Sequence, residues 1–151
     1  MDKKVSERER RLVLRVLSQW EARRGTRLFL PRSEAGPQVF GEDWPSCFIL
    51  DLASHGDPGF AYIGAALRRD HDGADWRRLS QCPEGTLLRH ATDFLRQVVE
   101  RRIPVSVGGA GRHGGQDILF RAILLPLSDD GTAIDFLLGA ANCRAVVSPG
   151  G

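Results

Sequence analysis

Cysteine is scarce in this sequence, and its three copies form no recognisable pattern. Cys47, Cys82 and Cys143 lie far apart and are odd in number, so they do not indicate a disulfide framework. No Cys-x-x-Cys pair indicates a zinc site. Because free cysteine is among the most buried residue types, we expect three buried or half-buried thiols.

Long hydrophobic runs are also lacking. No apolar stretch approaches the roughly 20 residues that span a bilayer as a helix. The first residues, MDKKVSERERRLVLRVL, lack the apolar segment of a signal peptide. We therefore expect a cytoplasmic protein with no membrane partner.

Excess charge of one sign is the third absence. The net charge is +2, which is too small to indicate a nucleic-acid partner by itself. Arginine pairs such as Arg23–Arg24 and Arg68–Arg69 are spread along the chain and are balanced by 19 acidic residues. They indicate a solvated surface, and an anionic partner remains the alternative; nucleic acid is not expected.

What the sequence does contain suits one soluble globular domain. Of the 151 residues, 42% are apolar and 26% are charged. A chain of this length buries roughly 68–70% of its unfolded surface, which is enough for a core without disulfides or metals.

The run GAGRHG at 109–114 matches the Gly-x-Gly-x-x-Gly fingerprint of dinucleotide-binding sites, and Asp129 and Asp130 follow at about the usual distance. That fingerprint requires a helix that begins at the glycines. The next residues, DILFRAILLPL, favour a strand instead, because they are β-branched or aromatic and include Pro126. Too few residues follow Gly114 to complete a dinucleotide-binding sheet. We predict a flexible hairpin connection over GGAGRHGG.

Hydrophobic periodicity predicts the order of elements. We expect a helix over 6–24, an irregular connector over 25–45, strands over 47–54 and 60–67 joined by a turn over 55–59, loops and short turns over 68–85, a helix over 86–102, and strands over 103–107, 117–127 and 133–140. This order predicts an α+β domain, with a five-stranded antiparallel sheet, helices packed on one face and an N-terminal helix.

The natural pocket of such a domain lies between the sheet and the helix over 86–102. The predicted inward positions are Phe48, Leu50, Phe60, Tyr62, Phe94, Phe120, Leu124, Phe136 and Leu138. Only the Tyr62 hydroxyl is polar among them, which argues against acid–base catalysis.

The order of elements and four short motifs resemble a PAS-type sensor domain, and more closely a subgroup of small stand-alone bacterial PAS proteins. The motifs are LSQW at Leu17–Trp20, LPRSEAGP at Leu30–Pro37, FILDL at Phe48–Leu52 and PLSDDGTAIDFLLG at Pro126–Gly139. The second strand departs from the subgroup, because it continues as AYIGAALRRD. The resemblance covers about residues 10–146. We expect an N-terminal helix at 1–25 that is a candidate for dimerisation, a PAS-like sensory domain at 26–146 and a disordered tail at 147–151.

The resemblance implies signal reception, small-ligand sensing and protein–protein contact without catalysis. No kinase, cyclase or DNA-binding segment fits in this sequence beside the PAS core, so we expect the output to pass through another signalling protein. Flavin photosensors of the family carry Asn-Cys-Arg-Phe-Leu-Gln around a reactive cysteine. Cys82 lies in SQCPEG, so we expect no flavin.

Haem-binding members often take an axial histidine from the helix that corresponds here to 86–102. His90 lies on the flank of that helix's apolar face, so the sequence does not support haem, and the identity of any cofactor stays unknown. His71 falls in a polar loop, and His55 and His113 in turns. Asp70, Asp72 and Asp75 are spaced like calcium ligands. Gln81 stands where such a loop needs glutamate, so we expect no metal site.

No catalytic motif is present, so no catalytic residue is predicted. A small α+β enzyme with an apolar pocket is the alternative function, and it would need a buried Asp, Glu or His facing a cavity.

Leu14 lies off the apolar stripe of the first helix. A helix with apolar residues on two sides usually has two neighbours, so we predict a homodimer with Leu14 and Leu17 near its axis. An ordinary exposed leucine is the alternative.

Overall fold

The structure is a computed structural model that describes residues 2–53 and 56–146, with side chains described from residue 11 onward. The predicted tail at 147–151 and His55 of the predicted turn lie outside the described residues.

Five antiparallel strands form one sheet in the order β2-β1-β5-β4-β3. The strands are β1 (Cys47–Asp51), β2 (Gly59–Ile63), β3 (Val105–His113), β4 (Gln116–Leu127) and β5 (Phe136–Ala145). The helices are α1 (Asp2–Arg24), α2 (Pro37–Phe40), α3 (Ala65–Asp70), α4 (Leu87–Thr92) and α5 (Leu95–Arg101), with 3₁₀ turns η1 (Arg32–Glu34), η2 (Gly41–Ser46) and η3 (Leu79–Gln81). The predicted α+β fold with five antiparallel strands is confirmed.

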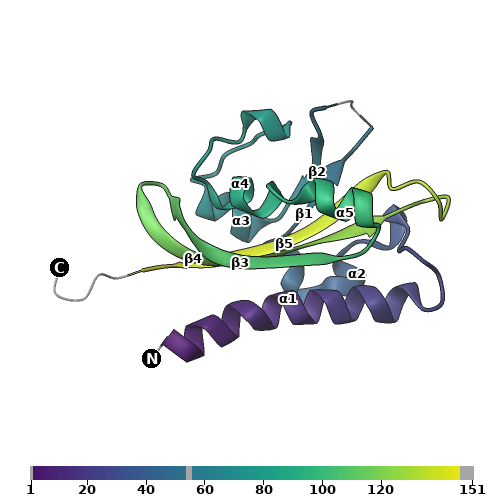
Figure 1. Cartoon of the computed structure of the whole chain (residues 1–151), viewed down its shortest axis with the longest axis horizontal. Helices are drawn as coiled ribbons and strands as arrows, with labels where there is room; N and C mark the ends of the chain where they lie inside the picture. The colour runs from purple at the N-terminus through teal and green to yellow at the C-terminus, as the bar shows by residue number, and fades with distance from the viewer. Residues whose placement is uncertain (1, 54–55, 147–151) are drawn as a thin grey trace.

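The sheet separates two hydrophobic cores. Helices α3, α4 and α5 lie on one face, and α1 crosses the other (Figure 1). Because side chains alternate along a strand, the central strands are buried on both sides. On β4, Ile123 and Leu125 face α1, whereas Ala122 and Leu124 face α4 and α5.

Helix α1 follows the predicted apolar stripe. Leu12, Val13, Val16 and Trp20 are at most 6% exposed. The Trp20 indole Nε1 donates to the carbonyl oxygen of Pro126 on β4 at 3.2 Å, which fixes the helix across the sheet. The helix ends at Arg24, as the predicted range 6–24 had it, and Gly25 follows at φ 59°, because glycine adopts the left-handed conformation at little cost.

The predicted single helix over 86–102 is wrong, because two short helices, α4 and α5, occupy it. Thr86 caps α4 by accepting the Arg89 backbone N–H. The Thr92 hydroxyl donates to the Leu88 carbonyl at 2.8 Å, a bond that bends helices, and the chain breaks at 93–94. Arg102, at φ 62°, then ends α5.

The flexible connection predicted over GGAGRHGG is also wrong. Strand β3 continues to His113, and only Gly114 and Gly115 form the turn, at φ 59° and 80°, the signs that a two-residue hairpin turn requires. The strand glycines leave space for side chains that cross the sheet. A Cβ at Gly108 would stand 2.7 Å from Arg121 Cδ, and one at Gly111 would stand 2.8 Å from His90 Nε2.

Candidate functional site

Six of the nine predicted pocket positions lie on the α4–α5 face of the sheet. Phe48, Leu50, Phe94 and Leu124 belong to the buried cluster on that face, and the half-buried Phe60 and Phe120 pack against it. The fold therefore brings these six side chains together on one face of the sheet.

The other three positions, Tyr62, Phe136 and Leu138, lie on the α1 face and do not join them. Tyr62 stacks on Trp44 at 4.4 Å between ring centroids and donates to the Trp44 carbonyl at 3.1 Å. A bulge in β2 pairs Ile49 with Tyr62 but Leu50 with Phe60, and this reverses the alternation. On β5 it is Leu137 that faces α4 and α5, so the predicted register is one residue off.

Side chains fill the interior between the sheet and these helices. Leu50, Leu87, Leu88 and Leu124 are at most 1% exposed. The Phe48 ring covers Gly139 so closely that a Cβ there would stand 2.1 Å from Phe48 Cζ. Because the interior is closely packed, a binding site on this side of the sheet is expected at the rim of the helical layer.

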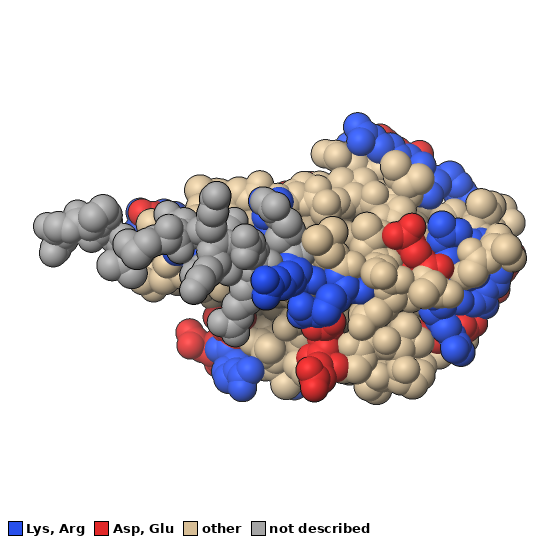
Figure 2. All heavy atoms as spheres, turned by 90° about the horizontal axis from the view of Figure 1, so that it is seen from below, with Lys and Arg blue, Asp and Glu red and all other residues tan. Residues whose placement is uncertain are grey.

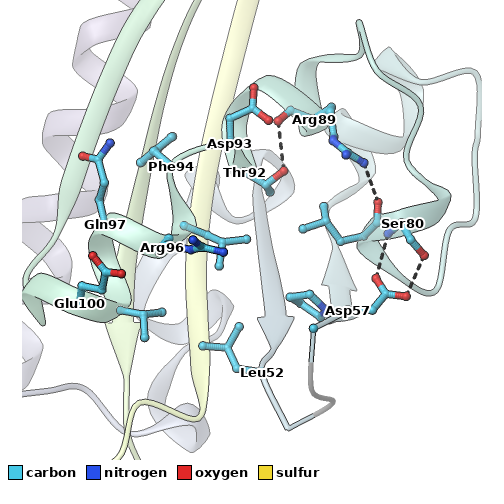
Figure 3. Close-up of a pocket in the computed structure, with 15 residues that line it drawn as sticks. Leu52, Asp57, Ser80, Arg89, Thr92, Asp93, Phe94, Arg96, Gln97 and Glu100 are labelled. Carbon is cyan, nitrogen blue, oxygen red and sulfur yellow. Dashed lines mark hydrogen bonds between the residues drawn. The ribbon is translucent and has the colours of Figure 1, made fainter.

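An open groove of about 840 Å³ lies at that rim, between the α4–α5 segment and the residues that follow β1 (Figure 3). Leu52, Phe94 and Val99 contribute apolar surface, and Phe94 is the one predicted pocket residue that also lines the groove. Arg96, Gln97 and Glu100 are exposed along its α5 wall.

Hydrogen bonds hold the opposite wall of the groove in place. Asp57 accepts from the Ser80 hydroxyl at 2.7 Å and from the Ser80 backbone N–H at 3.0 Å, and these bonds hold the pKa of Asp57 below its ordinary value. Arg89 donates to the carbonyls of Cys82 and Leu79 at 3.1 and 3.4 Å. Asp57 and Arg89 therefore fix η3, whereas the α5 side chains face the open groove.

Sequence reasoning missed this groove, because its walls come from three separated segments. The turn over 55–59 and the helix over 86–102 were predicted. Nothing in the spacing of Asp57, Ser80 and Arg89 indicated that they would meet.

Among the described residues, His71, His90 and His113 each bond to backbone groups at or beside α4. His90 Nε2 donates to the Arg112 carbonyl at 2.8 Å, and its ring stacks on Phe120 at 5.3 Å. The His90 ring thus packs on the β3–β4 hairpin rather than pointing inward as a haem ligand would. His71, which sequence reasoning placed in a polar loop, is 8% exposed and contacts His113.

The residues present do not fit a flavin. Cys82 is buried, its Sγ lies 3.2 Å from the Thr86 hydroxyl oxygen, and burial raises the pKa of its thiol. The filled interior described above leaves no cradle for a ring system beside it. Within residues 2–53 and 56–146, no three His, Cys, Asp or Glu side chains are grouped to hold a metal ion.

The face seen from below carries basic and acidic side chains next to one another (Figure 2). On the α1 side, Arg15 bonds Asp43 at 2.8 Å, and Arg23 and Arg27 each bond Glu34 at 2.7 Å. These pairs favour the solvated-surface interpretation of the arginines. None of the described helices combines the length and the apolar content needed to cross a bilayer.

No protein-family model matches the chain, and no curated protein matches it in sequence. Solved structures do match in fold. The LOV domain of a blue-light activated histidine kinase from Erythrobacter litoralis EL346 has a TM-score of 0.50 and 16% identity over 67% of this chain and 96% of that one. A fungal LOV domain photoreceptor has a TM-score of 0.50 and 17% identity over 86% of this chain and 90% of that one. LOV domains are a subgroup of PAS domains, so the chain has the PAS-type fold.

Proposed function

We propose that this chain is a non-catalytic PAS-type signalling module that senses a small ligand and passes the signal to another protein by direct contact. The observation that carries the proposal is the open groove beside α4 and α5 in a PAS-type fold whose interior is filled. An apolar floor with a polar rim is the usual composition of a recognition site.

In this proposal the ligand enters at Phe94, which joins the groove to the buried cluster. Movement of Phe94 would couple the groove to the remaining predicted pocket residues on this face. The exposed Arg96 and Glu100 then present opposite charges to a partner surface, which favours one orientation of binding.

The enzyme alternative has no observation in its favour. Among the side chains that the structure describes, two titratable ones besides the cysteines are buried, Asp43 and His71, and each is hydrogen-bonded within the fold. Neither lines the groove.

The proposal includes a homodimer in the bacterial cytoplasm, with the outer face of α1 as its interface. Leu14 is 55% exposed there, whereas Leu17 is half-buried and also packs on the chain's own core. Sedimentation at micromolar concentration tests the dimer. Leu14→Glu should give a monomer, and Leu28→Glu, which changes an exposed leucine outside α1, should leave the dimer intact.

The partner site is tested by affinity capture with matched charge reversals on α5. Arg96→Glu alters the groove, whereas Arg101→Glu changes an exposed arginine of the same helix outside it. We expect a captured protein to be lost with Arg96→Glu and kept with Arg101→Glu. Equal capture by both variants would exclude the groove as the contact surface.

The ligand is tested by an absorption spectrum and native mass spectrometry of the purified protein. Added mass that disappears in Phe94→Ala but persists in the Leu28→Glu control would support a ligand at the groove. A flavin or Soret band would overturn the expectation of neither flavin nor haem.

A further inference from the structure

Two imidazole rings join α3, α4 and the tip of the β3–β4 hairpin. His71 follows α3, and its Nδ1 lies 2.6 Å from the Leu67 carbonyl oxygen. Its Nε2 lies 3.1 Å from the Leu88 backbone nitrogen. A carbonyl can only accept and an amide N–H can only donate, so Nδ1 carries the proton and Nε2 is the acceptor.

His113, the last residue of β3, makes the same pair of bonds with its ring nitrogens exchanged. Its Nε2 donates to the Asp70 carbonyl oxygen at 2.6 Å, and its Nδ1 accepts the Leu87 backbone N–H at 2.8 Å. Each ring therefore connects a carbonyl of α3 to an amide of α4. The two amides lie in the first turn of α4, where backbone N–H groups have no partner within the helix.

The two rings also contact each other. Their centroids are 4.7 Å apart at an interplanar angle of 77°, and Trp76 packs edge-on against His71 at 5.3 Å. His71 is 8% exposed, so water cannot readily replace its bonds. The arrangement requires both rings to be neutral, because each must keep one nitrogen without a proton.

We propose that His71 and His113 form a proton-operated latch, which holds α4 against α3 and the β3–β4 hairpin when both rings are neutral and releases it when His71 is protonated. A protonated imidazole has two donors and no acceptor. The second N–H of His71 would then face the backbone N–H of Leu88, and the bond between them would be lost.

The surrounding charges set the direction of the effect. Burial lowers the pKa of His71 below its ordinary 6.5, and the nearby His113 lowers it as well. The backbone bond to Leu67 and the carboxylates of Asp70 and Asp72 raise this pKa, but they do not cancel the lowering. Two further titratable groups on the neighbouring elements bond elsewhere. On β3, Arg112 donates to the Gly115 carbonyl and pairs with Asp117 at 3.5 Å. On α4, His90 bonds the Arg112 carbonyl. The stabilisation by neutral His71 is therefore complete above pH 6.5 and is lost as the pH falls through the lowered value.

Release of the latch would act on the groove. Arg89 and Thr92, on the same short helix, line it, and Arg89 holds η3 by its two carbonyl bonds. Loosening of the first turn of α4 would therefore change the wall of the groove. The latch itself does not depend on which partner or ligand the groove binds.

The tautomers are tested directly in the wild-type protein by nitrogen-15 NMR of the imidazole rings at about pH 7.5. We expect a protonated Nδ1 in His71 and a protonated Nε2 in His113, which are opposite tautomers. The same tautomer in both rings, or a doubly protonated ring at this pH, would overturn the latch.

The switch is tested by native-state hydrogen exchange at the Leu87 and Leu88 amides, corrected for intrinsic exchange rates. Opening that takes up one proton at His71 makes the open population rise about tenfold per pH unit as the pH falls below 6.5. We expect a slope near one in the wild type and near zero in His71→Gln. Glutamine keeps a donor and an acceptor but does not titrate.

His90→Gln is the matched control, because His90 uses its ring only as a donor to a carbonyl and keeps that bond when protonated. Its slope should equal that of the wild type. A wild-type slope near zero, or a slope near one that survives in His71→Gln, would overturn the proposal. If a glutamine variant fails to fold, the wild-type slope and the ring tautomers still decide it.

Discussion

The two faces of the sheet are built in different ways. One 23-residue helix, α1, covers the first face with a regular apolar stripe. The second face carries three helices of six or seven residues, joined by turns. Among the described residues, the only positive-φ residues other than glycine, Asp72 and Arg102, lie in this second layer. Irregular backbone of this kind concentrates where a protein binds or switches.

Polar groups follow the same division. On the α1 side they include ion pairs at the surface, such as Arg23–Glu34. On the α4–α5 side they bond to backbone groups, as Arg89, His71 and His113 do. We therefore expect α1 to supply stability, and in the proposed function the helical layer supplies recognition at a lower local stability.

The largest expected effect comes from removing the main anchor of the α1 face. Trp20→Ala removes a side chain that is 2% exposed and leaves the Pro126 carbonyl without its partner. We expect the free energy of unfolding to fall by about 3–5 kcal/mol in denaturant titrations. Trp20→Phe, which keeps most of the packing, should cost about 1–3 kcal/mol through the orphaned carbonyl. A loss below about 1 kcal/mol for Trp20→Ala would show that α1 is not a structural anchor.

A smaller effect is expected at a glycine where the second face is tightly packed. Gly139→Ala would press a methyl group into the buried Phe48 ring, whose nearest carbon lies 2.1 Å from the added Cβ. Such overpacking costs about 1–3 kcal/mol.

Gly109→Ala is the matched control on β3, because its Cβ would meet only Phe120 at an ordinary 3.7 Å. It should change stability by less than about 1 kcal/mol, in the stabilising direction, because alanine restricts the unfolded chain. Equal effects of the two substitutions in denaturant titrations would contradict close packing at Phe48.

The regular half of the molecule was the predictable half. The stripe from Leu12 to Trp20 and the stop at Gly25 gave α1 almost whole, because helical periodicity is a local signal. The strands of the sheet were also found. The face of Phe136 and Leu138 was reversed, because the alternation does not show where a strand's register begins.

The irregular half was less predictable for a physical reason. The break at 93–94 depends on a side-chain bond from Thr92, and the β3 glycines depend on Arg121 and His90 crossing them. The contact between His71 and His113 joins residues far apart in the sequence. Tertiary contacts of this kind leave no periodic pattern in the sequence. The sequence therefore indicated only a polar loop around His71 and a glycine-rich connection at 108–115.

Thiol labelling should sharpen the comparison of the two faces. Cys47 lies in β1 against the α1 core, and Cys82 precedes α4 in the other core, with each at most 1% exposed. Burial raises the pKa of both thiols. With Cys143→Ser and one of the two replaced by alanine, we expect Cys82 to react at least about tenfold faster in native buffer, because it needs only local opening. Equal rates would show that the two layers open together.

The smallest expected effect is electrostatic and again distinguishes the two sides. The bonds from Arg27 and then Arg23 lower the pKa of Glu34, in η1, from 4.5 to about 2. The contribution of Glu34 to stability is therefore complete above pH 4.5 and is lost as the pH falls through about 2. The stability difference between the wild type and Glu34→Gln should therefore shrink over that range.

Asp57, in the groove, has its pKa lowered mainly by bonds to neutral Ser80. Carbon-13 NMR titration in about 1 M salt should move the Glu34 midpoint up towards 4.5 and leave that of Asp57 nearly unchanged, because salt screens charge pairs at the surface. A Glu34 midpoint near 4.5 already at low salt would show that its arginine pairs do not persist in solution.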